Sequence, residues 1–189
     1  MADDRELLNE KTKIVSVTHV SNALGVVNPV KEIAKLAHEA GAVIVVDGAQ
    51  AVPHGVVDVQ ELDADFYAFS AHKMCGPTGF GILYGKESLL SEMPPYRGGG
   101  DMIDKVTFEE TTYNIAPFRF EAGTPPIAAS SGFDKALEYL DGIGMANIAA
   151  REEELVQYAL DELSKIEGLR IIGNPWKRAS VISFVFDEI

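Results

Sequence analysis

The run Ser70-Ala71-His72-Lys73 places a hydroxyl, an imidazole and an amine within four residues. A lysine that is partly removed from water favours its neutral form, and a neutral amine can attack a carbonyl carbon to form a Schiff base. Ser70 and His72 can donate hydrogen bonds to a phosphate group. Taken alone, Lys73 is better explained as an exposed turn residue, because most lysines are exposed.

Asp47 and Gln50 form a second polar pair, directly after the most apolar run of the chain, residues 42–46. Gln50 would face roughly the same way as Asp47 if the chain turns helically there. A carboxylate at the end of a buried strand is expected to be poorly solvated and to need a cationic partner. The alternative is that Asp47 only caps the following turn.

Together, the two groups of residues meet the needs of pyridoxal phosphate. This cofactor requires a lysine for its Schiff base and an acid against its pyridinium nitrogen. Its phosphate requires short polar donors. The residues that supply these groups, if the two segments meet, are Asp47, Gln50, Ser70, His72 and Lys73.

The elements around these residues predict a parallel α/β sheet. Apolar, β-branched runs predict strands at residues 13–17, 42–46 and 65–70, and a hairpin partner at 80–84. A helix is expected to begin at Asn28-Pro29 and to end at Gly41. Strand, helix and strand in this order are typical of a parallel sheet, whose ligands bind at the carboxyl ends of the strands. The unbroken apolar run at 42–46 predicts a strand that is covered on both faces.

The second half of the chain is patterned differently. Residues 85–126 are expected to be mostly loop. Helices are predicted at 127–140, with Phe133, Leu137 and Leu140 on one face, and at 149–166. The second helix is expected to turn four residues inward: Leu155, Ala159, Leu163 and Ile166. Strands at 169–172 and 180–186 complete a predicted α+β unit that begins near residue 130.

Composition narrows the classes of function. The formal net charge of −13 argues against a nucleic-acid groove and against a polybasic membrane surface. The chain has no apolar run of about 18 residues, so no membrane span is expected. The N-terminal segment is polar and acidic, unlike a signal peptide. The single cysteine, Cys75, excludes an internal disulfide and fits a cytoplasmic location.

Two motifs carry a family resemblance: VDGAQ at residues 46–50 and SAHKMCGPTGFGILYG at 70–85. They resemble the class V aminotransferase family and, within it, the SufS-type cysteine desulfurases. Segments 18–42, 96–103 and 120–129 fit the same subgroup. The resemblance implies that residues 1–126 are part of the large pyridoxal-phosphate domain, with a mostly parallel sheet. It also implies that residues 127–189 begin a smaller α+β C-terminal domain.

The resemblance implies a role for each polar residue of the two motifs. Lys73 would bind the cofactor covalently and then act as general base and acid. Asp47 would pair with the pyridinium nitrogen, and Gln50 would hydrogen-bond the phenolic oxygen. Ser70 and His72 would hold the phosphate. No metal site is predicted.

Two further residues gain roles from the same resemblance. Thr124 would reach the cofactor phosphate of a neighbouring subunit, which implies a homodimer. Asn22 would lie near the substrate carboxylate. The implied reaction converts L-cysteine to L-alanine and leaves a persulfide on the enzyme. A sulfur-acceptor protein would take this sulfur for iron–sulfur cluster assembly.

The cysteine that attacks the substrate is not expected to be Cys75, which is predicted to be a small packing residue. The resemblance places that cysteine and a carboxylate-binding arginine beyond Ile189. It places a phosphate-binding turn and a ring-stacking histidine before Met1. The chain alone is therefore expected to be inactive. Alternatives are another class V enzyme, such as a selenocysteine lyase or an aminotransferase-like epimerase, and a non-catalytic domain that keeps only fold and dimer contacts.

Four weaker features are given structural interpretations. The GGGD motif at residues 98–101 could hold a phosphate, but no strand precedes it and no helix follows it. Residues 151–154, of sequence REEE, predict a solvated helix face. His19 is expected to be structural, and Trp176 is expected to pack at a turn.

Overall fold

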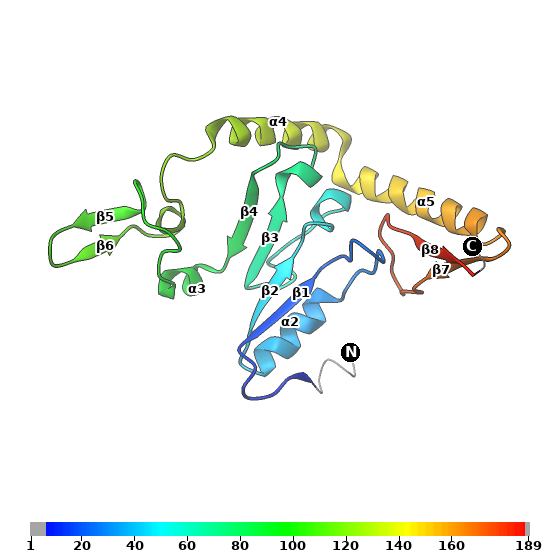
Figure 1. Ribbon diagram of the computed structural model, residues 1–189, viewed down its shortest axis with the longest axis horizontal. Coiled ribbons are helices and arrows are strands. Elements are labelled where there is room, and N and C mark those ends of the chain that lie inside the picture. The colour runs from blue at the N-terminus through cyan, green and yellow to red at the C-terminus, as the bar shows by residue number, and fades with distance from the viewer. Residues whose placement is uncertain (1–6, 188–189) are drawn as a thin grey trace.

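Four strands form the central sheet of the computed structural model, which describes residues 7–187 (Figure 1). They are β1 (Ile14–Thr18), β2 (Val43–Asp47), β3 (Phe66–Ser70) and β4 (Gly81–Gly85), in the order β1-β2-β3-β4. The first three are parallel, and β4 runs antiparallel to β3. The predicted parallel α/β sheet and the predicted hairpin partner are confirmed, with strand bounds that differ by about one residue.

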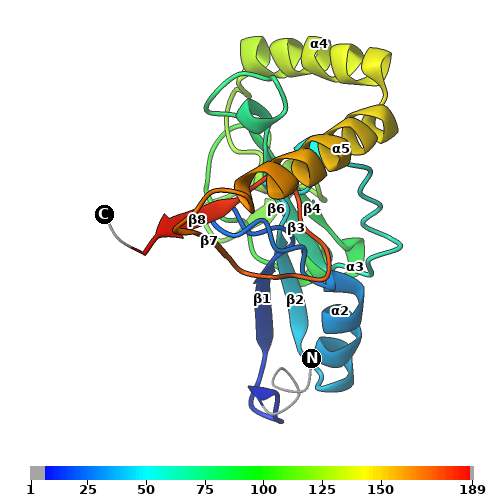
Figure 2. The ribbon, with the colours of Figure 1, turned by 90° about the vertical axis from the view of Figure 1, so that its right-hand side faces the viewer.

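Helix α2 (Val30–Glu39) connects β1 to β2 and lies against one face of the sheet (Figure 2). Its Val30, Ala34 and Ala37 form a core with Ile44 and Val46 of β2, and all five side chains are buried. Residues three and four apart share one side of a helix, whereas alternate residues share one side of a strand, which is why these positions meet.

The end of α2 is the one predicted. Gly41 follows the C-cap Ala40 with a φ of +71°, a left-handed conformation that glycine adopts without strain. The start is one residue later than predicted, because Pro29 is the N-cap and not the first helical residue.

The other face of the sheet is more open than the apolar run predicted. In β2, Val43 and Val45 are only half-buried, while Ile44 and Val46 are buried. Ile14 of β1 is 65% exposed and Leu83 of β4 is 60% exposed. The prediction that β2 is covered on both faces is therefore wrong within the described residues.

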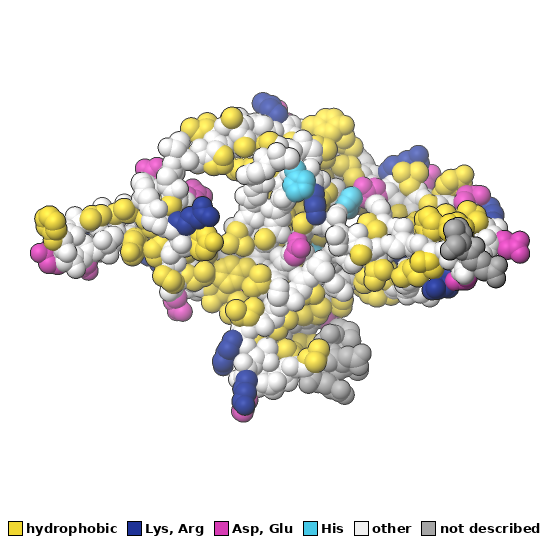
Figure 3. Space-filling view, in the orientation of Figure 1, with side chains coloured by type: hydrophobic (Ala, Val, Ile, Leu, Met, Phe, Trp, Pro, Cys, Tyr) yellow, Lys and Arg dark blue, Asp and Glu magenta, His cyan; other side chains and the backbone are white. Residues whose placement is uncertain are grey.

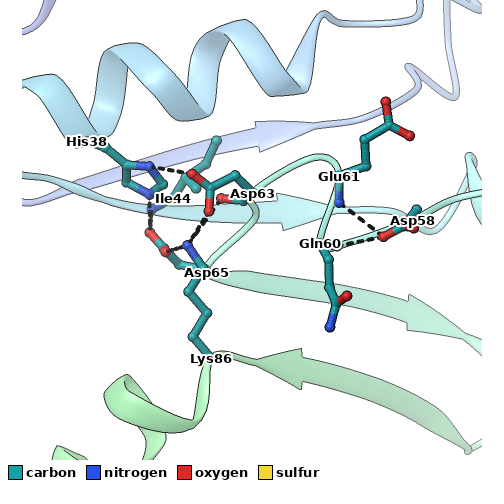
Figure 4. Close-up of polar contacts among 8 residues, drawn as sticks. All are labelled: His38, Ile44, Asp58, Gln60, Glu61, Asp63, Asp65 and Lys86. Atoms are coloured by element: carbon teal, nitrogen blue, oxygen red, sulfur yellow. Dashed lines mark hydrogen bonds and ion pairs between the residues drawn. The ribbon is translucent and has the colours of Figure 1, made fainter.

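A charged cluster closes the edge of the sheet opposite the carboxyl ends of its parallel strands (Figure 4). The buried Asp65 accepts hydrogen bonds from His38 Nε2 and from the Ile44 amide, each at 2.9 Å. Lys86 Nζ lies 2.8 Å from Asp65 and 2.6 Å from Asp63. His38 Nδ1 lies 3.2 Å from Asp63. The cluster joins α2, β2, the turn before β3 and the end of β4.

The segment between β4 and residue 126 contains more structure than predicted. It holds helix α3 (Glu87–Glu92), a hairpin of β5 (Ile103–Val106) and β6 (Thr111–Tyr113), and a 3-10 turn, Phe118–Phe120. The hairpin projects away from the sheet (Figure 1). Its strands are short and polar, so they lack the alternation that identifies a half-buried strand.

Two long helices follow, separated by Gly144 at a φ of +88°: α4 (Ile127–Ile143) and α5 (Met145–Leu163). Phe133 and Leu140 of α4 are buried against the chain after β3, as predicted, although Leu137 is 37% exposed. Neither long helix has the apolar character of a bilayer span, nor does any other helix within residues 7–187.

The inward face predicted for the second helix is partly wrong. Leu155 and Ile166 are 47% and 46% exposed, and Ile166 lies beyond the end of α5. Ala159 and Leu163 are half-buried. Much of α5 extends past the sheet, so only part of it is covered (Figure 1). Strands β7 (Leu169–Ile172) and β8 (Ser183–Phe186) pair antiparallel after it. The bounds of β7 are those predicted, whereas β8 begins three residues later than predicted. The division of the chain at residue 126 stays a prediction.

Candidate active site

The carboxyl ends of β1, β2 and β3 meet at one edge of the sheet, and this edge carries the predicted site. Asp47 lies beside Thr18 on one side and Ala68 on the other. The His19 amide donates to the Asp47 carbonyl at 2.8 Å. Ser70 ends β3 two residues after Ala68, on the same face of the strand. The register thus brings the Asp47 and Ser70 segments to the same edge, as the sequence predicted.

Asp47 is exposed, so the expectation of a poorly solvated carboxylate is wrong. Its Oδ1 accepts a hydrogen bond from the Ala49 amide at 2.9 Å, which is the turn-capping role that the sequence left open. Among the residues described, no side chain bonds its other carboxylate oxygen. The capped turn fixes the carboxylate and leaves one oxygen free for a ligand.

Tyr67, which is buried, and His19, which is half-buried, form a pair beneath this turn. The Tyr67 hydroxyl lies 2.9 Å from His19 Nδ1, and the two rings meet edge to face. Burial raises the pKa of Tyr67, and the charge of Asp47 raises it further. Burial lowers the pKa of His19, and the charge of Lys177 adds to this effect. Both groups are therefore neutral at pH 7, and the pair acts as a support for the Asp47 turn.

Lys73 ends a 3-10 turn, Ala71–Lys73, that follows β3 directly. The turn is anchored by Ala71, whose carbonyl accepts hydrogen bonds from Met74 and Gly76 at 2.8 and 3.0 Å. Lys73 is half-buried, and no side chain or carbonyl of residues 7–187 bonds its amine. Its amine is thus free to bind a ligand at the edge of the sheet.

Gly76 is required by this turn. A Cβ at residue 76 would lie 2.7 Å from the Phe133 ring and 2.9 Å from the Ala71 carbonyl. Both distances are too short for a real side chain, so the glycine allows the loop to close over α4. Gly76 therefore helps to set the shape of the loop after Lys73.

Ser70 and His72 lie together next to Lys73. Ser70 Oγ is 3.1 Å from His72 Nδ1, and His72 is exposed. His72 Nε2 and the remaining hydrogen-bonding capacity of the Ser70 hydroxyl are therefore available to bind an anion.

The other predicted site residues form no hydrogen bond with this group within the part of the chain that the structure describes. Gln50 is half-buried in the turn after β2, Asn22 is exposed in the loop between β1 and α2, and Thr124 is exposed just before α4. None of these three side chains forms a hydrogen bond with another described residue. Their roles stay predictions.

The GGGD motif lies next to the turn that carries Thr124. The Gly100 carbonyl accepts hydrogen bonds from the Met102 amide at 2.8 Å and the Gly123 amide at 2.9 Å. The motif leads into β5 and not into a helix, so it lacks the geometry of a phosphate loop.

Three sequence interpretations outside the site need correction. Cys75 is exposed, with a φ of +59°, and is not a packing residue. Trp176 is 77% exposed and does not pack at its turn. Glu152, predicted on a solvated face, is half-buried and accepts hydrogen bonds from His54 Nδ1 at 2.9 Å and from Ser180 Oγ.

A cavity of about 780 Å³ lies between α5 and the chain that follows β7. Its lining includes His54, Glu152, Trp176 and Lys177, but none of the predicted site residues. His19 and Ala51 also line the cavity, so it borders the turn after Asp47, but Ser70, His72 and Lys73 do not line it.

The residues at the sheet edge fit pyridoxal phosphate. Lys73 has a free amine for the carbonyl of the cofactor, and Asp47 has a free carboxylate oxygen for a protonated ring nitrogen. Ser70 and His72 offer polar groups for the phosphate. Sequence reasoning identified these four residues but missed Tyr67, whose only signal was a polar hydroxyl within the otherwise apolar run 66–69.

Comparison with known proteins places the chain among related sequences and structures. The family model for aminotransferase class V matches residues 1–189. A cysteine desulfurase of Haloferax volcanii is 54% identical over 190 residues, which cover 100% of this chain and 45% of that protein. A crystal structure of the Escherichia coli cysteine desulfurase CsdA is 40% identical with a TM-score of 0.90, over 97% of this chain and 46% of that one.

A second solved structure agrees with the first. The apo cysteine desulfurase of Thermococcus onnurineus NA1 is 38% identical with a TM-score of 0.92, over 100% of this chain and 47% of that one. The chain therefore spans less than half the length of these three relatives.

Proposed function

Since the chain belongs to the aminotransferase class V family, we propose that it forms part of a pyridoxal-phosphate-dependent cysteine desulfurase. The proposed reaction converts L-cysteine to L-alanine and transfers the sulfur to an enzyme cysteine as a persulfide. The observation that carries the proposal is the half-buried, unpaired amine of Lys73 at the edge where Asp47 and Ser70 also lie. The 54% identity to a cysteine desulfurase supports the same substrate.

Each residue of the group has a proposed task. Lys73 Nζ holds the cofactor covalently and then moves protons to and from the substrate. The free Asp47 oxygen accepts a hydrogen bond from the protonated ring nitrogen, and Gln50 donates a hydrogen bond to the phenolic oxygen. Ser70 and His72 bind the phosphate. When bound, pyridoxal phosphate supplies a ring that stabilises negative charge on the substrate carbon.

The remaining parts of the proposal concern the subgroup, the oligomeric state, the location and the substrate carboxylate. The motifs support the SufS-type subgroup, with a sulfur-acceptor protein and iron–sulfur assembly as its purpose. The exposed Thr124 suits a contact with a second copy, as a homodimer requires. A cytoplasmic location is part of the same proposal. Asn22 is assigned to the substrate carboxylate.

The attacking thiol is proposed to belong to a cysteine outside residues 1–189. Cys75 lies in the turn after Lys73, is exposed and has a φ of +59°. Replacing Cys75 by serine is expected to leave cofactor binding unchanged, which would separate this residue from the proposed group.

Cofactor binding by the chain tests the proposed function. Adding pyridoxal phosphate is expected to give the visible absorbance of a lysine-linked cofactor, and borohydride reduction should fix its mass on the peptide that contains Lys73. Lys73→Ala should abolish both signals, while Lys105→Ala, at an exposed position on the hairpin, should keep them. If the parent chain shows neither signal, the proposed function fails. Cofactor binding without sulfide release from L-cysteine is the expected result, because the attacking thiol is proposed to lie outside residues 1–189.

A further inference from the structure

The loop that carries Asn22 holds its own shape. The Ser21 amide donates to the Val26 carbonyl at 2.9 Å, and the Gly25 amide donates to the Ser21 carbonyl at 3.0 Å. Ser21 Oγ accepts a further bond from the Leu24 amide at 3.1 Å. These bonds close residues 21–26 into one compact turn, so the turn moves as a unit.

This turn is docked on the chain that precedes β8. The Ala179 amide donates to the Gly25 carbonyl at 2.8 Å, and Ser183 Oγ donates to the Ala23 carbonyl. Gly25 has a φ of +67°, and a Cβ there would lie 2.4 Å from the Val181 carbonyl. The contact is made largely by backbone atoms at close range, so it has a fixed geometry.

Arg178 lies at the centre of this contact. Its Nη1 donates to the Leu24 carbonyl at 2.9 Å and to the Val181 carbonyl at 3.3 Å. Its Nη2 donates to the Gly173 carbonyl at 2.6 Å. The backbone of Arg178 also forms an antiparallel bridge with Val26.

The partners of Arg178 indicate what it does. All of its acceptors among the described residues are backbone carbonyls, and none is a carboxylate. A guanidinium has donors in a rigid planar fork, which can join several carbonyls at once. A lysine amine at the same place could not reach both the turn and the chain after β7 with this geometry. The residue is therefore built to hold one segment against another.

We infer that Arg178 is a positioning residue, which locks the turn at residues 21–26 and thereby sets where Asn22 meets the carboxylate of an amino-acid substrate. The inference rests on the proposed function for the role of Asn22. Arg178 itself does not touch the substrate. Because the turn and residues 173–183 are joined in this way, a displacement of the C-terminal segment moves Asn22 with it.

Hydrogen–deuterium exchange of the chain without cofactor tests the docking. In Arg178→Ala, the amides of Gly25, Val27 and Ala179 are expected to exchange at least about tenfold faster than in the parent, because local opening exposes them. Arg170→Ala is the matched control: Arg170 is an exposed arginine on β7, paired with Asp187 at 3.2 Å. It should leave these three amides unchanged. Equal protection in the parent and Arg178→Ala would overturn the inference.

Binding of L-alanine to the cofactor-loaded protein tests the link to Asn22. The apparent Kd, followed by the visible spectrum, is expected to rise about tenfold in Arg178→Ala and in Asn22→Ala, as expected for loss of a hydrogen bond to a charged group. Adding Arg178→Ala to Asn22→Ala should then cause little further change, because the two residues act through one contact. Arg178→Lys should not restore binding.

The outcomes separate this inference from the proposed function. A further tenfold loss in the double variant would show that Arg178 acts only on the fold, and would overturn the inference. Full rescue by Arg178→Lys would also overturn it, because charge alone would then suffice. Failure of the parent to bind pyridoxal phosphate would refute the proposed function instead, while the exchange experiment would still decide the docking.

Discussion

Gly48 shows how one missing side chain shapes the site. A Cβ at this position would lie 1.9 Å from Tyr67 Cε1, so the tyrosine ring occupies the space that any other residue would need. The ring in turn brings its hydroxyl to His19. The glycine therefore allows the Asp47 turn to rest directly on the buried Tyr67 ring.

Gly48→Ala is expected to destabilise the chain, because the new methyl group must displace a buried ring. The expected loss in the free energy of unfolding is about 1–3 kcal/mol. Urea unfolding followed by circular dichroism measures it. Gly142→Ala is the control, since nothing lies within 4 Å of a Cβ at that position of α4. There, alanine should raise stability by up to about 1 kcal/mol. Parent-like stability of Gly48→Ala would contradict the packing.

At this scale, the sequence predicted the residues that follow strands better than the residues within them. Asp47, Ser70 and Lys73 were identifiable because polar groups after apolar runs must lie at a sheet edge. The Tyr67–His19 pair was not, because periodicity indicates that a side chain is buried but not which atom it meets. The exposure of Trp176 escaped prediction for the same reason, since a single aromatic residue carries no periodicity.

At the scale of elements, ion pairs and hydrogen bonds among His38, Asp63, Asp65 and Lys86 connect helix α2 with the central sheet. Burial raises the pKa of Asp65, but hydrogen bonds from Lys86, the Ile44 amide and His38 outweigh it, so the pKa falls below its ordinary value of 3.8. The hydrogen bond from Lys86 lowers the pKa of Asp63 as well. Burial lowers the pKa of Lys86, and the two carboxylates more than reverse this, so its pKa lies above 10.5.

These directions predict a pH dependence of stability. A carboxylate whose pKa is lowered by folding stabilises the chain fully above about 3.8, and this contribution is lost as the pH falls through the lowered value. Lys86 has the opposite sense: its contribution is present below 10.5 and is lost as the pH rises through the raised value. Asp65→Asn should therefore cost about 1–3 kcal/mol at pH 7, and less as the pH falls below 3.8.

Unfolding in urea at several pH values measures this difference. Asp58→Asn is the control, because Asp58 Oδ1 accepts the Gln60 and Glu61 amides at 2.9 and 3.0 Å, and an asparagine oxygen can accept the same bonds (Figure 4). A constant difference between the parent and Asp65→Asn from pH 7 to pH 2 would contradict the assigned charge state.

An element was predictable where the apolar pattern of its sequence corresponds to a covered face in the structure. The strands of the main sheet and helix α2 were found within about one residue because each has residues that are buried or half-buried against the core. The β5–β6 hairpin was missed because it has almost none. The inward face of α5 was overpredicted, since an amphipathic pattern shows that a face could be covered and not that a partner covers it.

On the scale of the whole molecule, several large apolar side chains are exposed to solvent. Hydrophobic side chains gather on the face seen in Figure 3, in the region of α3 and β4. Leu83 of β4 and Ile14 of β1 are each more than half exposed, and Tyr96 after α3 is 82% exposed. Large apolar patches on a protein surface mark sites of association.

The 189-residue chain is therefore expected to associate in solution. Sedimentation equilibrium should show species larger than the monomer. Leu83→Lys should raise the dissociation constant of this association at least about tenfold, because a charge is costly to bury in an apolar contact. Val106→Lys, at an exposed position on the projecting hairpin, is the control. A parent chain that sediments as a stable monomer would contradict this expectation.

The bond between Arg178 and Leu24 also sets an order of events during synthesis. Strands β1 to β4 pair within residues 14–85, so the edge with Asp47 and Lys73 can form once this part of the chain has emerged. The Leu24 carbonyl meets its guanidinium partner only 154 residues later. In a growing chain, the sheet edge with Asp47 and Lys73 would thus form first. The turn at residues 21–26 would reach its final position only after the C-terminal strands had been synthesised.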